Sequence, residues 1–91
     1  MYKITKYTLK RAKKLGLIVK PSTNKTKKID VYKDDVKIAS VGANGMNDYP
    51  TYIQTRGLKY AKTRRRLYRK RHEKDRHVKR SNGWLADKLL W

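Results

Sequence analysis

The sequence contains no cysteine and no phenylalanine, and only seven of its 91 residues are acidic. The absence of cysteine excludes disulfides, thiol catalysis and every zinc site that needs a thiolate, and nothing indicates adaptation to an oxidising compartment. No apolar run approaches the roughly 18 residues of a transmembrane span. Residues 1–20 mix lysine through their apolar positions, so we expect neither a membrane span nor a signal peptide.

The chain has a large excess of positive charge: 26 Lys and Arg against seven Asp and Glu give a formal net charge of +19. Such a charge attracts polyanions over about 8 Å at physiological salt, and its self-repulsion opposes compaction. The charge is densest between Lys59 and Arg80, where 12 basic residues face only Glu73 and Asp75. We therefore expect an acidic partner.

The hydrophobic pattern predicts a small single α+β domain over residues 1–91. A short helix and an extended segment are expected in residues 1–20, a β-hairpin in residues 27–42, and basic helices in residues 50–91. The domain is small and only 37% hydrophobic. Because so short a chain buries only about 60% of its unfolded surface, its stability is expected to be marginal.

The first helix is expected to begin at Thr5 or Thr8 and to end at Gly16. Leu9, Ala12 and Leu15 are predicted to face inward. The apolar triplet after Gly16 is predicted to be extended, because a proline follows it and disfavours helix at the preceding residue.

The hairpin is predicted from two alternating runs, one around Ile29 and Val31 and one from Val36 to Val41. The turn between them, Asp34-Asp35, lacks the glycine of the best type I′ turns, so the sequence favours a type I turn in a slightly longer loop. Closely spaced glycines at the end of the second strand indicate a backbone with positive φ or a close approach to another group. A plain strand-to-helix turn is favoured over a phosphate-cradling loop, because the spacing matches no known phosphate-binding pattern.

A helix is expected to begin near Pro50, capped by the preceding polar residues, and to break at Gly57. The following helix is predicted to bury one stripe, formed by Tyr60, Ala61, Leu67 and Tyr68. Arg64 lies within this stripe. It is either a structural arginine that snorkels or pairs with a carboxylate such as Asp48, or an anion contact at an interface.

The last eight residues are apolar and have helical spacing. This tail is either the lid of the chain's own core or an anchor on another protein. The candidate anchor residues are Trp84, Leu85, Leu89 and Trp91.

No catalytic constellation is evident. His72 and His77 are five residues apart, which is not the four-residue spacing that places two metal ligands on one helical face. Glu73 is expected to pair with Arg69 at i,i+4, and Ser40 lacks a credible histidine and acid partner. We therefore expect no enzymatic activity, no metal, no cofactor and no small-molecule substrate.

A series of motifs runs along nearly the whole chain. The motifs are Tyr7-Thr8, Lys14-Leu15-Gly16, Lys20-Pro21-Ser22-Thr23, Lys27-Lys28-Ile29-Asp30-Val31, Ile38-Ala39-Ser40-Val41-Gly42-Ala43, Asn47-Asp48-Tyr49-Pro50-Thr51-Tyr52, Arg71-His72-Glu73-Lys74-Asp75-Arg76 and Gly83-Trp84-Leu85-Ala86-Asp87-Lys88-Leu89-Leu90-Trp91. This series resembles a family of small basic proteins encoded by giant viruses of the nucleocytoplasmic large DNA virus group. The family has no assigned catalytic residue to carry over. The resemblance implies a viral origin and a place in the virion.

Two functions compete. The first is a structural virion component, a minor capsid or cement-like protein that uses its basic helix against acidic capsid surfaces and its tail as an anchor. The alternative is sequence-independent DNA binding during genome packaging. The candidate anion-binding residues are Lys62, Arg64, Arg65, Arg66, Arg69, Lys70, Arg71 and Arg76.

Two weaker hypotheses use the same basic residues. Lysine and arginine clusters with nearby tryptophan also suit peripheral binding to an anionic membrane. The basic run also matches a nuclear localisation signal, a pattern of low specificity. The expected location is the virion, with the host cytoplasm or nucleus during assembly.

Overall fold

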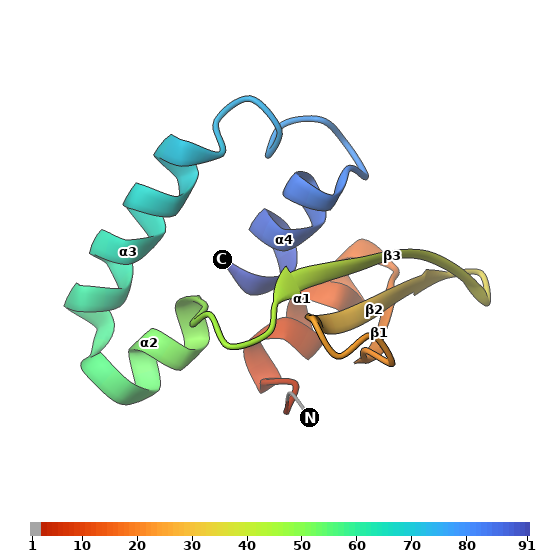
Figure 1. Cartoon of the computed structure of the whole chain (residues 1–91), viewed down its shortest axis with the longest axis horizontal. Coiled ribbons are helices and arrows are strands. Elements are labelled where there is room, and N and C mark those ends of the chain that lie inside the picture. Colours follow the sequence, from red (N-terminus) through yellow and green to blue (C-terminus); the bar gives the residue numbers. More distant parts are fainter. Residues whose placement is uncertain (1–2) are drawn as a thin grey trace. The chain divides into compact units, whose positions relative to one another are not determined.

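The computed structural model describes residues 3–91, in which four helices and a three-stranded antiparallel sheet confirm the predicted α+β class (Figure 1). The expected order of helix, hairpin and further helices is also observed. The elements are α1 (Lys6–Leu15), β1 (Ile18–Pro21), β2 (Lys27–Lys33), β3 (Val36–Ala43), α2 (Tyr49–Arg56), α3 (Leu58–Arg71) and α4 (Asn82–Leu90).

The chain divides into two units, Met1–Met46 and Asn47–Trp91. The first unit contains α1 and the sheet, and the second contains the other three helices. The predicted single domain stays a prediction, and each unit is described by itself below.

In the first unit, α1 has the predicted caps. The side chain of Thr5 accepts a hydrogen bond from the backbone N–H of Thr8, and Gly16 closes the helix with φ 70°. The inward face was predicted only in part: Ala12 is buried as expected, but Thr8 is the other buried residue, and Leu9 and Leu15 are 50% and 37% exposed. Steps of three residues drift around a helix of 3.6 residues per turn, so the predicted triplet does not stay on one face.

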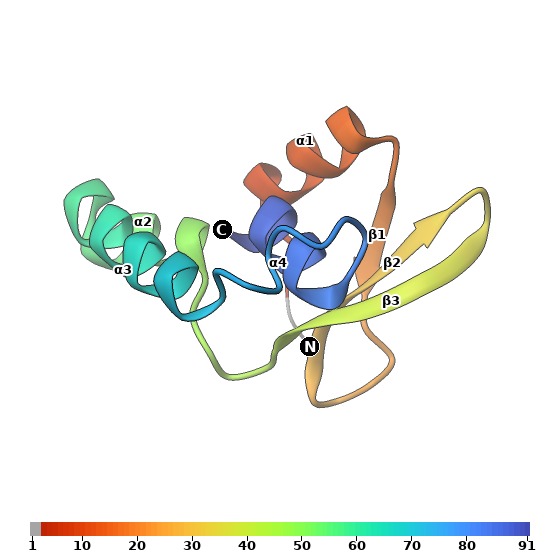
Figure 2. The same cartoon turned by 90° about the horizontal axis from the view of Figure 1, so that it is seen from above.

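The sheet has the order β1-β2-β3, because the extended segment after Gly16 adds a third strand to the hairpin (Figure 2). Val19 pairs with Val31, and Ile29 pairs with Val41. Paired residues of neighbouring strands point to the same face, and all four of these side chains are buried. The alternation of the first run therefore produces one apolar face. The second run was predicted only in part, because Val41 is buried but Val36 and Ile38 are 62% and 38% exposed.

The hairpin turn differs from the prediction. Lys33 pairs directly with Val36, and the two loop residues Asp34 and Asp35 have φ values of 50° and 65°. Positive φ at both positions of a two-residue loop is the signature of a type I′ turn, whose twist matches that of the strands. Aspartate tolerates this conformation better than most residues, which is why the turn forms without glycine.

In the second unit, α2 begins as predicted: Asp48 caps it by accepting a hydrogen bond from Thr51, and Pro50 lies in its first turn. Gly57, with φ 89°, separates α2 from α3. After α3 the chain turns through residues 72–81 before α4 begins (Figure 1). The side chain of Ser81 caps α4 by accepting a hydrogen bond from the backbone N–H of Trp84.

The inward stripe of α3 was predicted only in part. Ala61 and Tyr68 are buried and Tyr60 is half-buried, but Leu67 is 40% exposed. Tyr68 stacks on Trp91 with ring centroids 4.4 Å apart, so an aromatic contact joins α3 to the end of the chain. Leu67 lies at the flank of this contact face, where a side chain is only partly covered.

Candidate functional site

The candidate anion-binding surface lies on α3, where eight of 14 residues are Lys or Arg and none is acidic. A helix of such composition cannot bury much of its surface, and only two of its residues are buried. The structure separates the predicted basic residues into a group that contacts other side chains of the second unit and a group that does not.

Two arginines lie over tyrosine rings of α2. The guanidinium carbon of Arg65 is 4.1 Å from the ring centroid of Tyr49, and that of Arg64 is 5.6 Å from that of Tyr52. The Nε atom of Arg64 is buried without a hydrogen-bond partner. Among the described residues, Asp48 does not pair with Arg64, so the expected carboxylate contact is replaced by a cation–π contact.

Two further arginines hold a buried carboxylate. Arg69 Nε donates to Asp87 Oδ1 at 3.0 Å, and Arg76 Nη1 lies 3.8 Å from Asp87 Oδ2. Asp87 is 1% exposed. The predicted i,i+4 pair of Arg69 with Glu73 is therefore wrong, because the buried acid on α4 takes Arg69 instead.

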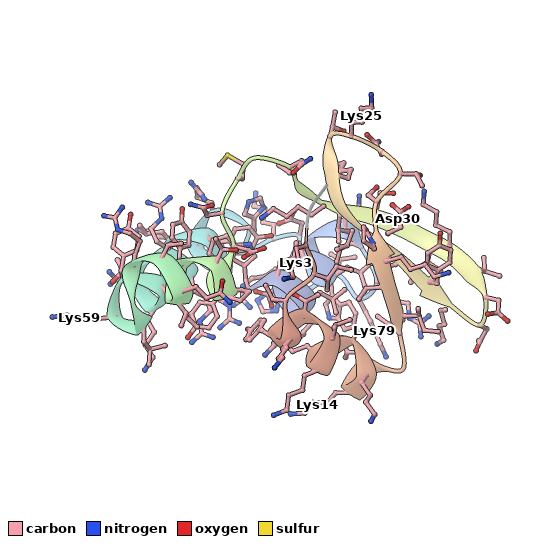
Figure 3. The ribbon with its side chains drawn as sticks, turned by 90° about the horizontal axis from the view of Figure 1, so that it is seen from below. Lys3, Lys14, Lys25, Asp30, Lys59 and Lys79 are labelled. Carbon is pink, nitrogen blue, oxygen red and sulfur yellow. The ribbon has the colours of Figure 1, made fainter. Side chains whose placement is uncertain are left out.

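Lys62, Arg66 and Lys70 form a row that we call the α3 ridge, spaced i, i+4, i+8 along one helical face. All three side chains are exposed, and within residues 3–91 they make no ion pair, hydrogen bond or ring contact. With Arg65, Arg69 and Glu73 they line a shallow hollow along α3. Arg71, the last residue of α3, is also exposed. Figure 3 shows Lys59 projecting from the same helix near its start.

The acid at the end of the ridge is neutralised locally. Glu73 contacts His77 Nε2 at 2.6 Å and Arg76 Nη2 at 3.2 Å. These contacts, the hydrogen bond with His77 first, lower the pKa of Glu73. His72 stacks on Tyr68 and contacts Asp75 at 3.4 Å. The acids of this segment therefore do not compensate the ridge.

The tail is folded into the chain. Leu85 and Leu89 are fully buried, Trp91 is 8% exposed, and Trp84 is half-buried. Trp91 contacts Tyr68 and lies 6.2 Å from Tyr52 between ring centroids. Burial raises the pKa of Tyr68 to about 12, with a further contribution from the charge of Asp87, so the phenol stays protonated in this core. Of the two expectations for the tail, these contacts favour the lid of the chain's own core.

The first unit contains a buried acid that the sequence did not single out. Asp30 is 1% exposed and accepts hydrogen bonds from Ser22 Oγ and Ser40 Oγ, both at 2.6 Å. These two hydroxyls, with smaller contributions from Thr23 and Lys37, lower its pKa to about 2. Ser40 thus has an acid partner, contrary to expectation. A carboxylate of so low a pKa is a poor base, so the contact is structural.

The residues 3–91 contain no group of three or more histidine or acidic side chains placed to hold a metal ion. None of the helices in this range has the length and apolarity needed to cross a membrane. Comparisons of the chain with protein-family models, with curated proteins and with solved structures found no match.

The sequence predicted the basic helix, but it did not distinguish the α3 ridge from the other basic residues of that helix. The i, i+4, i+8 spacing was visible in the sequence, but the tyrosines and the aspartate that take the other arginines are distant in sequence. Asp87 carried the only available signal, an acid within an apolar helix, which requires a cationic partner when buried.

Proposed function

We propose that the protein is a non-enzymatic DNA-binding protein that contacts duplex phosphates without regard to sequence and aids genome packaging in a large DNA virus. The observation that supports it best is the α3 ridge, three exposed cations on one helical face that pair with none of residues 3–91. The viral setting rests on the sequence resemblance described above.

The ridge is unfavourable for the isolated chain. Lys62 and Arg66, and Arg66 and Lys70, are like-charge pairs at i,i+4, each of which destabilises a helix by roughly 0.2–0.5 kcal/mol. Phosphates would remove this repulsion and release counterions from the DNA. The ridge spans eight residues, about 12 Å at 1.5 Å per residue, which suits several phosphates of one strand.

The positions of the aromatic residues favour contacts with the phosphate backbone of DNA over contacts with its bases. Proteins that bind single strands expose aromatic faces on which bases stack. Here arginines lie over the rings of Tyr49, Tyr52 and Tyr60. The α3 surface therefore offers charge without a stacking platform.

The alternative role as a minor capsid or cement-like protein needs an apolar anchor in addition to charge. The candidate anchor residues Leu85, Leu89 and Trp91 are buried in the folded chain. We therefore favour DNA binding over the structural role. Binding to an acidic capsid surface instead of DNA would support the structural role.

The test compares two triple variants with equal loss of charge. Lys62→Gln/Arg66→Gln/Lys70→Gln removes the ridge, and Lys74→Gln/Lys79→Gln/Arg80→Gln removes three exposed cations from the segment after α3. Duplex affinity is measured by fluorescence anisotropy between about 50 and 200 mM salt.

The ridge variant should flatten the slope of log K against log salt by about 2.7, at about 0.9 per lost phosphate contact. The matched variant should change the slope by less than about 1. Equal slopes in both variants, or weak binding of the wild type at 50 mM salt, would contradict the proposal and favour an acidic protein partner.

A further inference from the structure

A second cationic row lies on α1, in the other unit. Lys6, Lys10 and Lys14 have the same i, i+4, i+8 spacing as the α3 ridge, and we call them the α1 ridge. All three side chains are exposed and, within residues 3–91, make no ion pair or hydrogen bond. Figure 3 shows Lys14 projecting away from the helix.

Each ridge lies opposite the buried face of its own helix. In α1 the buried residues are Thr8 and Ala12, centred about 180° from the ridge at 100° per residue. In α3 they are Ala61 and Tyr68, centred about 150° away by the same measure. Folding of each unit thus fixes its ridge on the outer side of the helix.

The charge is divided almost equally between the units. Met1–Met46 contains 12 Lys and Arg against three acids, a net charge of +9, and Asn47–Trp91 contains 14 against four, a net charge of +10. Each unit therefore attracts a polyanion by itself. A duplex bound to one unit leaves the charge of the other uncompensated.

We propose that the chain is bivalent: the α1 ridge is a second phosphate-binding surface, and the protein holds two duplex segments at once through its two units. This inference rests on the proposed function of α3. Bridging two segments opposes the mutual repulsion of DNA and would bring distant parts of a duplex together. Two linked sites also bind a long duplex more tightly than either site alone, because the second contact is intramolecular.

The experiment uses the full chain and two pools of short duplexes of about 12 base pairs, one with a donor and one with an acceptor fluorophore. Duplex is kept in excess, so that energy transfer reports proteins that hold two duplexes. The variant Lys6→Gln/Lys10→Gln/Lys14→Gln removes the α1 ridge. Its matched control is Lys3→Gln/Lys25→Gln/Lys33→Gln, which removes the same charge from scattered positions of the first unit.

Wild type and matched control should give energy transfer and two duplexes per chain. The α1-ridge variant should bind one duplex, with energy transfer reduced to the level of duplex alone. Circular dichroism and sedimentation confirm that the variants are folded and that the protein is monomeric, so that transfer does not arise from dimers.

Transfer that persists in the α1-ridge variant, or one duplex per wild-type chain, would overturn bivalency. Neither result affects the proposed function, which is tested separately by the salt dependence of the α3-ridge variant and by wild-type binding at about 50 mM salt. The two failures are therefore distinguishable.

Discussion

The two units stabilise a buried aspartate in opposite ways. In the first unit, Asp30 is held mainly by neutral hydroxyl donors. In the second, Asp87 is held by two guanidinium groups. Because Asp30 is held mainly by hydroxyl groups, it engages few of the lysines of the first unit. Asp87 instead engages Arg69 and Arg76, which are two of the candidate anion-binding residues of the second unit.

This difference shows that charge density in the sequence overstates the binding surface. Of the basic residues around α3, Arg69 and Arg76 support the fold, and Arg64 and Arg65 lie over tyrosines. Among residues 47–91, the exposed cations that make no such contact include the three of the ridge. Neutralising these structural arginines would lower stability as well as affinity, so they are poor probes of function.

The largest expected effect is that of Asp87→Asn, which leaves both guanidinium groups without their carboxylate. Breaking a buried ion pair costs roughly 3–5 kcal/mol, and partial exposure of Arg69 and Arg76, 34% and 20%, reduces this to about 2–3 kcal/mol. Urea denaturation followed by tryptophan fluorescence measures it. Both tryptophans belong to the second unit, which also contains Asp87.

The control for this variant is Asp75→Asn, whose side chain is 54% exposed and, within residues 3–91, forms an ion pair only with His72. It should change the free energy of unfolding by no more than about 0.5 kcal/mol. Equal losses in the two variants would show that the buried pair does not stabilise the second unit more than a surface pair does.

The sequence predicted features that depend on neighbouring residues. The caps at Thr5, Gly16 and Asp48 and the break at Gly57 follow from local backbone chemistry, and the hairpin follows from its alternation. The α+β class followed from these elements.

Features that depend on tertiary contacts were missed. The buried side of α1 depends on its tertiary neighbours. The partners of the α3 arginines are also distant in sequence: Arg69, for example, contacts Asp87, 18 positions away. The turn at Asp34-Asp35 was missed for another reason: the lack of glycine favoured a type I turn, but the twist of the strands favours type I′ and aspartate tolerates its positive φ. Finding the two ridges required both the sequence and the structure. The spacing in the sequence places the cations in a row, and the structure shows that they pair with no other side chain of residues 3–91.

A second prediction concerns acid stability of the first unit. The pKa of Asp30 is lowered to about 2, from an ordinary value near 3.8. A lowered pKa in the folded state stabilises it above about pH 4, and this stabilisation is lost as pH falls from about 4 through about 2. Ser22→Ala removes the strongest donor, so the loss should begin at higher pH, and stability at neutral pH should fall by about 1.5 kcal/mol.

Hydrogen exchange of the β2 amides, measured from pH 5 down to pH 2, checks this. Asp30→Asn provides the reference, because it has no group that titrates in this window and should lose the pH dependence. The same acid profile in Ser22→Ala and wild type would show that the hydroxyl does not hold the carboxylate ionised.

The smallest expected effect concerns the turn between β2 and β3 in the first unit. This turn has two residues, whereas the connection between α3 and α4 in the second unit has ten. Asp35 has φ 65°, a conformation that costs most non-glycine residues roughly 1–2 kcal/mol and aspartate less. Asp35→Gly removes this strain but also gives the unfolded chain more freedom. The net stabilisation should be about 0.5 kcal/mol, read from hydrogen exchange of the β2 and β3 amides. Asp35→Val, a β-branched residue at the same φ, should destabilise the sheet by more than about 1 kcal/mol, and a stabilising Asp35→Val would contradict the assigned type I′ turn.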